Sequence, residues 1–78
     1  MNITYRIRND EICDQNGNKY TVFGVDVFDD EEKIIKSVKD IFFDYAQAQD
    51  FVRRCNTEKL ELIHLDDVVY NEIVKQLS

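Results

Sequence analysis

Apolar and polar residues alternate along three stretches in the first half of the chain, at residues 3–8, 20–28 and 33–41. A period of two sends successive side chains to opposite faces, so each stretch is predicted to be a half-buried β-strand. The sequence Asn9-Asp10-Glu11 interrupts the first alternation, which predicts a bulge or a bend there. The third strand is expected at an edge of the sheet, where its lysines discourage pairing with another sheet.

Two turns separate these strands. Asn16-Gly17 is the strongest short hairpin signal, because both residues tolerate the positive φ of a two-residue turn. The acidic run Asp29–Glu32 stands where the second turn is due and is interpreted as a solvated hairpin tip. A cation site is the sharper alternative for this run, but the alternating spacing and the glycine of a calcium loop are missing. The three strands are therefore expected to form an antiparallel meander.

The middle strand carries apolar residues on both of its faces. Phe23, Val25 and Val27 share the face that we expect the rest of the chain to cover. Gly24, within this run, predicts either a bulge or the close approach of a neighbouring segment. The opposite face has a second apolar set, made up of Tyr20, Val22 and Phe28.

The pattern then changes to a helical period. Asp44 and Gln47 have the spacing of a weak capping box at the start of a first helix. Residues at i, i+3, i+4 and i+7 give this helix a core face of Ala48, Phe51, Val52 and Cys55. Asn56 is predicted to end the helix in the left-handed region. Residues 60–63, which follow, fit either a short fourth strand or an apolar loop.

A second helix is predicted near the C-terminus. Asp66 is a favoured N-cap residue, and Asp67 would lie in the first turn, where the helix dipole stabilises a carboxylate. Leu65 is expected to pack on Tyr70 as a hydrophobic staple. The buried face is predicted to be the stripe Val69, Ile73 and Leu77, widened by Val74.

These elements predict one α+β domain over residues 1–78, in which a three-stranded antiparallel meander precedes two helices on one face (β-β-β-α-α). A chain this short buries only about 60–65% of its unfolded surface, so it needs good packing or self-association. No apolar run approaches the roughly 18 residues of a membrane span, and the N-terminus lacks the pattern of a signal peptide. We therefore expect a cytoplasmic protein with no membrane contact.

The charge balance limits the choice of partners. The net charge is −6, from 16 acidic and 10 basic residues spread along the chain. Nucleic-acid binding through phosphates needs a clustered basic face, and the nearest features are Arg6 with Arg8 and the pair Arg53-Arg54. We expect no nucleic-acid partner through a basic patch. An acidic mimic of nucleic acid fits the net charge, but the dispersed carboxylates rank it lower.

The residues that could carry chemistry are few. Cys13 and Cys55 lack metal-type spacing, and a zinc site that joined them to His64 would have long, irregular separations. His64, followed by Asp66 and Asp67, forms a possible functional polar cluster, since an imidazole beside a carboxylate can act as a general base. However, no nucleophile motif and no glycine-rich phosphate loop accompany it. We expect His64 to shape the entry to the last helix, and we expect no catalysis, metal or cofactor.

Four segments follow one another in the chain: Tyr20–Val25, Val38–Ile41, Cys55-Asn56 and Ile63–Val69. In this order they resemble a family of short clostridial-type bacterial proteins of unknown function. The last segment, Ile-His-Leu-Asp-Asp-Val-Val, is the most specific part, and the resemblance covers nearly the whole chain. It implies a stand-alone cytoplasmic bacterial domain and brings no catalytic residue with it.

The sequence therefore predicts a small interaction or regulatory module without catalysis. One layer of helices covers only one face of a sheet, and an uncovered apolar patch usually marks an interface. The predicted partner surface consists of Tyr20, Val22 and Phe28 on the second sheet face, with Phe42 and Phe43 at the strand-to-helix junction. The alternative is a homodimer that buries the same sheet face and thereby compensates for the small core.

Overall fold

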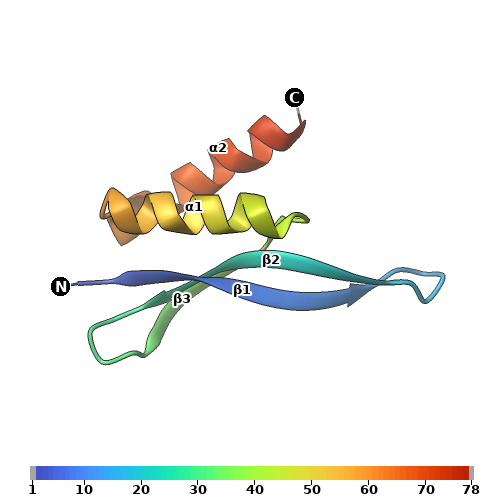
Figure 1. The fold of residues 1–78 in the computed structure, drawn as a ribbon, viewed down its shortest axis with the longest axis horizontal. Helices are drawn as coiled ribbons and strands as arrows, with labels where there is room; N and C mark the ends of the chain where they lie inside the picture. Colours follow the sequence, from blue (N-terminus) through green and yellow to red (C-terminus); the bar gives the residue numbers. More distant parts are fainter. Residues whose placement is uncertain (1, 78) are drawn as a thin grey trace.

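The computed structural model describes residues 2–77 and contains three strands, two helices and a short 3₁₀ turn (Figure 1). The elements are β1 (Thr4–Cys13), β2 (Lys19–Phe28), β3 (Ile34–Phe42), α1 (Tyr45–Thr57), the 3₁₀ turn (Leu62–His64) and α2 (Leu65–Leu77). The antiparallel sheet has the order β1-β2-β3, and both helices lie on one side of it. The α+β architecture expected from the sequence is confirmed.

The β1–β2 hairpin is long and regular. Its pairing runs without interruption from Thr4 opposite Phe28 to Cys13 opposite Lys19, so the bulge predicted at Asn9-Asp10-Glu11 is wrong. Asn9, Asp10 and Glu11 fit a regular strand because their side chains are exposed to water or, in the case of Asp10, bind Arg8. The distal half of this hairpin projects beyond the helical layer (Figure 1).

The irregularity lies in β3 instead, opposite Gly24. Phe23 pairs with Phe42 while Val25 pairs with Val38, so three residues of β3 oppose one residue of β2. A Cβ on Gly24 would lie 2.0 Å from the Val38 carbonyl oxygen, a distance that only glycine permits. Both alternatives foreseen for Gly24, a bulge and a close approach, therefore occur together.

The two hairpin turns share one geometry. The carboxylates of Asp14 and Asp29 each accept from the backbone N–H groups two and four residues further on, at 2.8 and 2.9 Å. The fourth position adopts positive φ in both turns, at 82° for Gly17 and 62° for Glu32. The predicted Asn-Gly hairpin is present, but Gly17 alone adopts positive φ in it. The acidic run forms the other tip, as interpreted from the sequence.

The core lies between the covered face of the sheet and α1. Val25 and Val27 are fully buried, which confirms the predicted inner face, and Phe23 packs edge-on against Tyr45. The remaining buried members of this cluster are Tyr5, Ile41, Phe42, Ala48, Phe51, Cys55, Leu65 and Val69. At about 25 cal/mol per Å² of apolar surface, this cluster supplies most of the stabilisation of so short a chain.

Helix α1 begins and faces the core as predicted, but it ends differently. The Asp44 side chain caps it by accepting from the Ala46 N–H at 3.1 Å. The left-handed residue after the helix is Lys59, with φ of 52°, so the assignment of that role to Asn56 is wrong. Asn56 lies in the last turn of α1, where its side chain reaches across to β1.

Asn56 completes the outer edge of β1. Its Oδ1 accepts from the Tyr5 N–H at 2.8 Å, and its Nδ2 donates to the Tyr5 carbonyl oxygen at 2.9 Å. The side-chain amide thus takes the place of a neighbouring strand at one residue, because both backbone groups would otherwise lack a partner at the edge. The Tyr5 hydroxyl also donates to the Leu60 carbonyl at 2.7 Å. These contacts join the end of α1 to the first strand.

Helix α2 begins two residues earlier than predicted. The 3₁₀ turn Leu62–His64 leads directly into it, so Asp66 lies inside the first turn with Asp67 and is not the N-cap. Leu65 is fully buried in the core, whereas Tyr70 is largely exposed, so no staple between the two forms. Among the described residues the sheet has three strands; residues 60 and 61 are a loop, and residues 62 and 63 belong to the 3₁₀ turn.

Candidate functional site

The second face of the sheet is more polar than the sequence suggested. Arg8 donates to Asp10 at 2.7 Å and to Asp26 at 3.1 Å, and the Ser37 hydroxyl donates to Asp26 at 2.6 Å. These side chains stand on all three strands, so the network crosses the whole sheet. Hydrogen bonds to both carboxylates raise the pKa of the Arg8 guanidinium. A charged network of this kind occupies the surface on which we expected an apolar patch.

The three apolar residues predicted on this face do not form an open patch. Val22 is only 2% exposed, because it stands on the central strand with Asp10 directly opposite, and its assignment to an accessible surface is wrong. Phe28 is half-buried beneath the Arg6 guanidinium, which lies 4.5 Å from the ring centre. Tyr20 is exposed, and its hydroxyl donates to Asp14 at 3.1 Å.

The two phenylalanines at the junction of β3 and α1 separate completely. Phe42 is 3% exposed and its ring lies 5.4 Å from that of Phe51, so its assignment to a partner surface is also wrong. Phe43 is 75% exposed. The bulge explains the outcome, since it shifts the register of β3 and directs Phe42 into the core.

The polar cluster around His64 is not joined by contacts. Asp66 binds Lys36 at 2.9 Å, and no hydrogen bond or ion pair between residues 2 and 77 connects His64 to either aspartate. His64 is exposed and its backbone N–H donates to the Glu61 carbonyl, which closes the 3₁₀ turn. His64 is therefore part of the turn that leads into α2. Within residues 2–77, no group of three or more metal-binding side chains is found.

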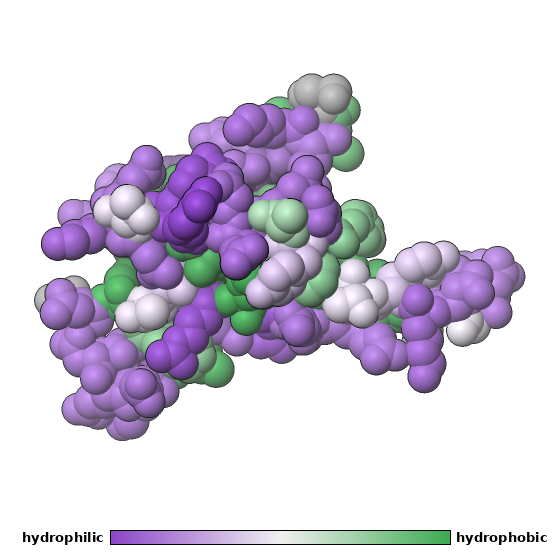
Figure 2. All heavy atoms as spheres, viewed as in Figure 1, coloured by the Kyte–Doolittle hydropathy of each residue, from purple (hydrophilic) through white to green (hydrophobic). Residues whose placement is uncertain are grey.

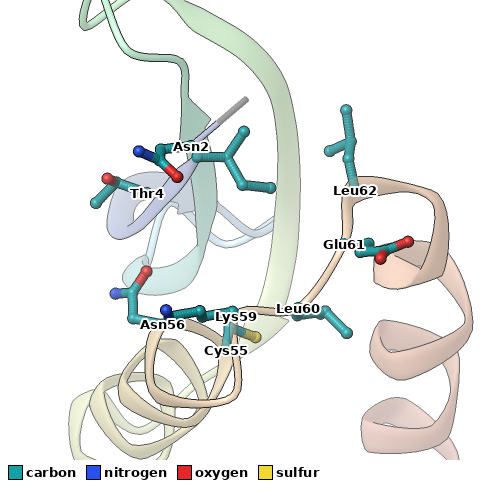
Figure 3. Close-up of a pocket in the computed structure, with 9 residues that line it drawn as sticks. Asn2, Thr4, Cys55, Asn56, Lys59, Leu60, Glu61 and Leu62 are labelled. Carbon is teal, nitrogen blue, oxygen red and sulfur yellow. The ribbon is translucent and has the colours of Figure 1, made fainter.

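The two cysteines lie in very different surroundings. Cys13 is exposed near the tip of the long hairpin, and Cys55 is buried on the core face of α1. Burial raises the pKa of the Cys55 thiol to about 11, so it is protonated and unreactive near neutral pH. An open hollow of about 590 Å³ lies beside Cys55, between the start of β1 and the loop that follows α1 (Figure 3).

Helix α2 exposes an apolar surface that the predicted sites did not include. Tyr70, Leu77 and Ile63 are 67%, 83% and 78% exposed, and they follow one another at seven-residue intervals. The surface formed by Tyr70, Ile73, Val74 and Leu77 of α2, together with Ile63 of the preceding 3₁₀ turn, is called the outer face of α2. Two positions of the predicted buried stripe, Ile73 and Leu77, thus point outward. In Figure 2, apolar atoms gather beside the C-terminal end of this helix.

The opposite side of α2 holds the helix in place. Leu65 and Val69 are the buried residues of α2, and both lie in its first half. Further along, Arg54 binds Glu72 at 3.0 Å, and Gln76 donates to the Ile41 carbonyl at 2.9 Å. The second half of α2 is therefore attached by polar contacts, which leaves its apolar residues on the side away from the protein.

The charged residues of α2 have opposite signs at the two ends of the helix. Asp66 and Asp67 lie in the first turn of α2, and Lys75 lies in the last. Each sign is the one that the helix dipole stabilises at that end. Lys75 is only weakly engaged, since Glu72 is 4.0 Å away and Arg54 binds the same carboxylate more closely.

A signal for this surface was present in the sequence. A helix that packs on one side needs one apolar stripe, but α2 carries Leu65 and Val69 on one side and Tyr70, Val74 and Leu77 on another. Apolar residues that exceed one stripe indicate a second contact surface. Periodicity alone did not show which stripe would face the core.

The fold defines the class of the protein as a small α+β domain, and its second helix exposes apolar side chains. A family of unknown function (DUF6514) matches residues 1–75, and the chain belongs to this family. No curated protein and no solved structure gives a significant match. None of the helices within residues 2–77 is long and apolar enough to cross a membrane.

Proposed function

We propose that the protein is a small interaction module without catalysis, and that the outer face of α2 is its binding surface. The observation that carries this proposal is the exposure of Tyr70 and Leu77 along one side of α2, with Ile63 also exposed in the 3₁₀ turn that precedes the helix. A helix that presents apolar residues at such spacing is a common means of protein recognition. Contiguous exposed apolar residues usually mark an interface in small soluble domains.

The other surfaces support this assignment. The second sheet face holds the network of Arg8, Asp10 and Asp26, which would have to be desolvated in any apolar contact. Within residues 2–77, no hydrogen bond or ion pair joins His64 to Asp66 or Asp67, so these side chains do not form an acid–base pair. The first turn of α2 is acidic, which does not favour a nucleic-acid partner. A protein partner that covers apolar side chains suits this surface best.

The experiment compares three immobilised forms of the full chain for the proteins they retain from an extract of the source cells. These forms are the wild type, a Tyr70→Ser/Leu77→Ser variant and a Phe43→Ser control. Phe43 is a matched control because it is similarly exposed but lies at the junction of β3 and α1 and not on α2. We expect the wild type and the control to retain the same protein, the chain itself included, and the double variant to lose it.

The competing interpretation is an enzyme that uses His64. A His64→Ala variant that stays folded but loses an activity found by screening would favour that interpretation. Retention of the same proteins by the double variant would refute α2 as the binding surface.

A further inference from the structure

We infer that the open hollow beside Cys55 binds a small aliphatic molecule that carries a carboxylate group, and that Lys59 pairs with this carboxylate. The site goes beyond the proposed function, because the residues that line the hollow are not those of the outer face of α2. The hollow has a volume of about 590 Å³, which is within the roughly 300–1,000 Å³ of small-molecule sites.

The walls of the hollow are mainly aliphatic. Ile3 at the start of β1 and Leu60 and Leu62 after α1 line it, and all three side chains are only partly buried against the core. The core residue Cys55 lines it as well. Each of the three aliphatic side chains thus keeps a surface that the core leaves to water, and an apolar ligand in the hollow would cover it. Burial of such surface is the main source of affinity at an aliphatic site.

Lys59 supplies the positive charge at this site. Its side chain lines the hollow and extends toward Asn56 and Thr4 (Figure 3). The carboxylate of Glu61, which also lines the hollow, points the other way, toward α2. Between residues 2 and 77 no ion pair holds the Lys59 ammonium group, although acidic residues outnumber basic ones by 16 to 10. An unpaired ammonium beside an aliphatic hollow is complementary to a ligand that joins an aliphatic chain to an anionic group.

The backbone places Lys59 beside the hollow at a cost. Lys59 adopts φ of 52° after α1, and the next residue, Leu60, donates its N–H to the Cys55 carbonyl at 3.0 Å. Glycine is the usual residue at the left-handed position of this helix ending. Strained backbone at a residue other than glycine is found most often at functional sites. Glycine in place of Lys59 would remove the charge and the strain together, which provides a variant that keeps the fold.

An extended peptide suits the hollow less well than a small molecule. A peptide that joined the sheet would pair with the outer edge of β1. The Asn56 amide already occupies both the N–H and the carbonyl of Tyr5 at this edge. The edge is therefore closed two residues beyond Ile3, and the hollow is left to a ligand that needs no backbone pairing.

The test titrates the full chain with octanoate and follows the backbone amide signals by NMR. We expect octanoate to saturate one site and to shift the amides of residues 2–4 and 59–62, which line the hollow. Octanol, which has the same chain length without the charge, should bind about threefold more weakly, and octylammonium more weakly still. Decanoate should bind about tenfold more tightly than octanoate, because two further methylene groups are buried.

Two variants test the role of Lys59. Lys59→Gly should lower the affinity for octanoate to that for octanol and leave the affinity for octanol unchanged. Lys39→Gln is the matched control, because Lys39 is also an exposed lysine without an ion pair among residues 2–77 but lies on β3. This control should bind octanoate as the wild type does. Thermal unfolding should show Lys59→Gly to be at least as stable as the wild type, since glycine adopts positive φ without strain.

The opposite results would overturn the inference. Equal affinities of the wild type for octanoate and octanol contradict the pairing with Lys59, and amide shifts confined to α2 contradict the hollow as the site. A tripeptide with a C-terminal leucine that binds more tightly than decanoate would replace the small molecule as the ligand. If neither acid saturates the protein, the hollow does not bind this class of ligand. Tyr70→Ser/Leu77→Ser should bind octanoate as the wild type does, so the failure of this inference is distinct from that of the proposed function.

Discussion

The two hydrogen bonds between the Asn56 side-chain amide and the β1 backbone lead to a prediction that can be tested by substitution at one position. Its Oδ1 accepts from the Tyr5 N–H at 2.8 Å, and its Nδ2 donates to the Tyr5 carbonyl at 2.9 Å. Asn56→Ala removes both bonds and leaves two backbone groups of the β1 edge without them. At about 0.5–1.5 kcal/mol for each hydrogen bond, we expect the free energy of unfolding to fall by roughly 1–3 kcal/mol.

Asn56→Asp gives a sharper result because it keeps the shape and changes one atom. The new carboxylate still accepts from the Tyr5 N–H, but its second oxygen replaces the donor and faces the Tyr5 carbonyl oxygen. Only the protonated carboxyl can donate there, so the folded state raises the pKa of the new group above its unfolded value of about 3.9.

The sign of the pH dependence follows from this shift. The folded state of Asn56→Asp binds a proton more tightly than the unfolded state, so the stabilising contact is complete below about pH 4 and is lost as the pH rises through the folded pKa. The variant should therefore be least stable relative to the wild type near pH 7. Its deficit should shrink by up to about 1.4 kcal/mol per pH unit as the pH falls toward 4.

The assay is urea unfolding followed by circular dichroism at pH 4, 5, 6 and 7 for the wild type and three variants. Asn56→Ala controls for loss of the amide, and its deficit should not depend on pH. Asn71→Asp adds the same charge at an exposed position of α2 and should change stability by less than about 0.5 kcal/mol. A deficit of Asn56→Asp that is absent at pH 7, or constant with pH, would refute the role given to Asn56.

Three further predictions follow from the backbone and the core. Gly24→Ala should destabilise by several kcal/mol or prevent folding, since its Cβ would lie 2.0 Å from a carbonyl of the β3 bulge; thermal unfolding measures this. Glu32→Gly should raise the free energy of unfolding in urea by about 0.5–1 kcal/mol, because Glu32 adopts φ of 62° and glycine adopts positive φ without strain. Gly17→Ala, at the same position of the other turn, should lower it. Burial raises the pKa of Cys55 to about 11 and of Tyr5 to about 12. The free energy of unfolding should therefore fall as the pH rises above about 9, because the unfolded state loses these protons first. Tyr5→Phe should remove the part of that loss that begins above about pH 10.

The elements of this fold were predictable because each has a simple pattern. Alternation identified all three strands, and one apolar stripe identified α1 and its buried face, including Cys55. Local chemistry was also sufficient at Asp44, which caps α1, and at Gly24, whose missing side chain indicated the bulge. In each case the residues that determine the feature are close together in the sequence or are required by the backbone itself.

The features that could not be predicted depend on distant residues. Asn56 appeared to be a helix end, but its amide binds Tyr5, which lies 51 positions away. Phe42 was assigned to the surface because the alternation of apolar and polar residues does not show by how many residues a bulge shifts the strand pairing. In β3 the bulge lies before Phe42 and changes the face on which this residue stands. Val22 was assigned to an open face because the sequence does not show which side chains flank it on the neighbouring strands.

The two stripes of α2 separate the residues that attach the helix to the core from those of the proposed binding surface. Leu65 and Val69 attach the helix to the core, while Tyr70 and Leu77 are exposed and contribute little to that attachment. Substitutions on the outer face should therefore change association without unfolding the chain. The second sheet face does not allow such a separation, because Arg8, its two carboxylates and Ser37 form one network across the three strands. The proposed binding surface on α2 can be changed more readily, because it and the residues that attach the helix to the core lie on different sides of the helix.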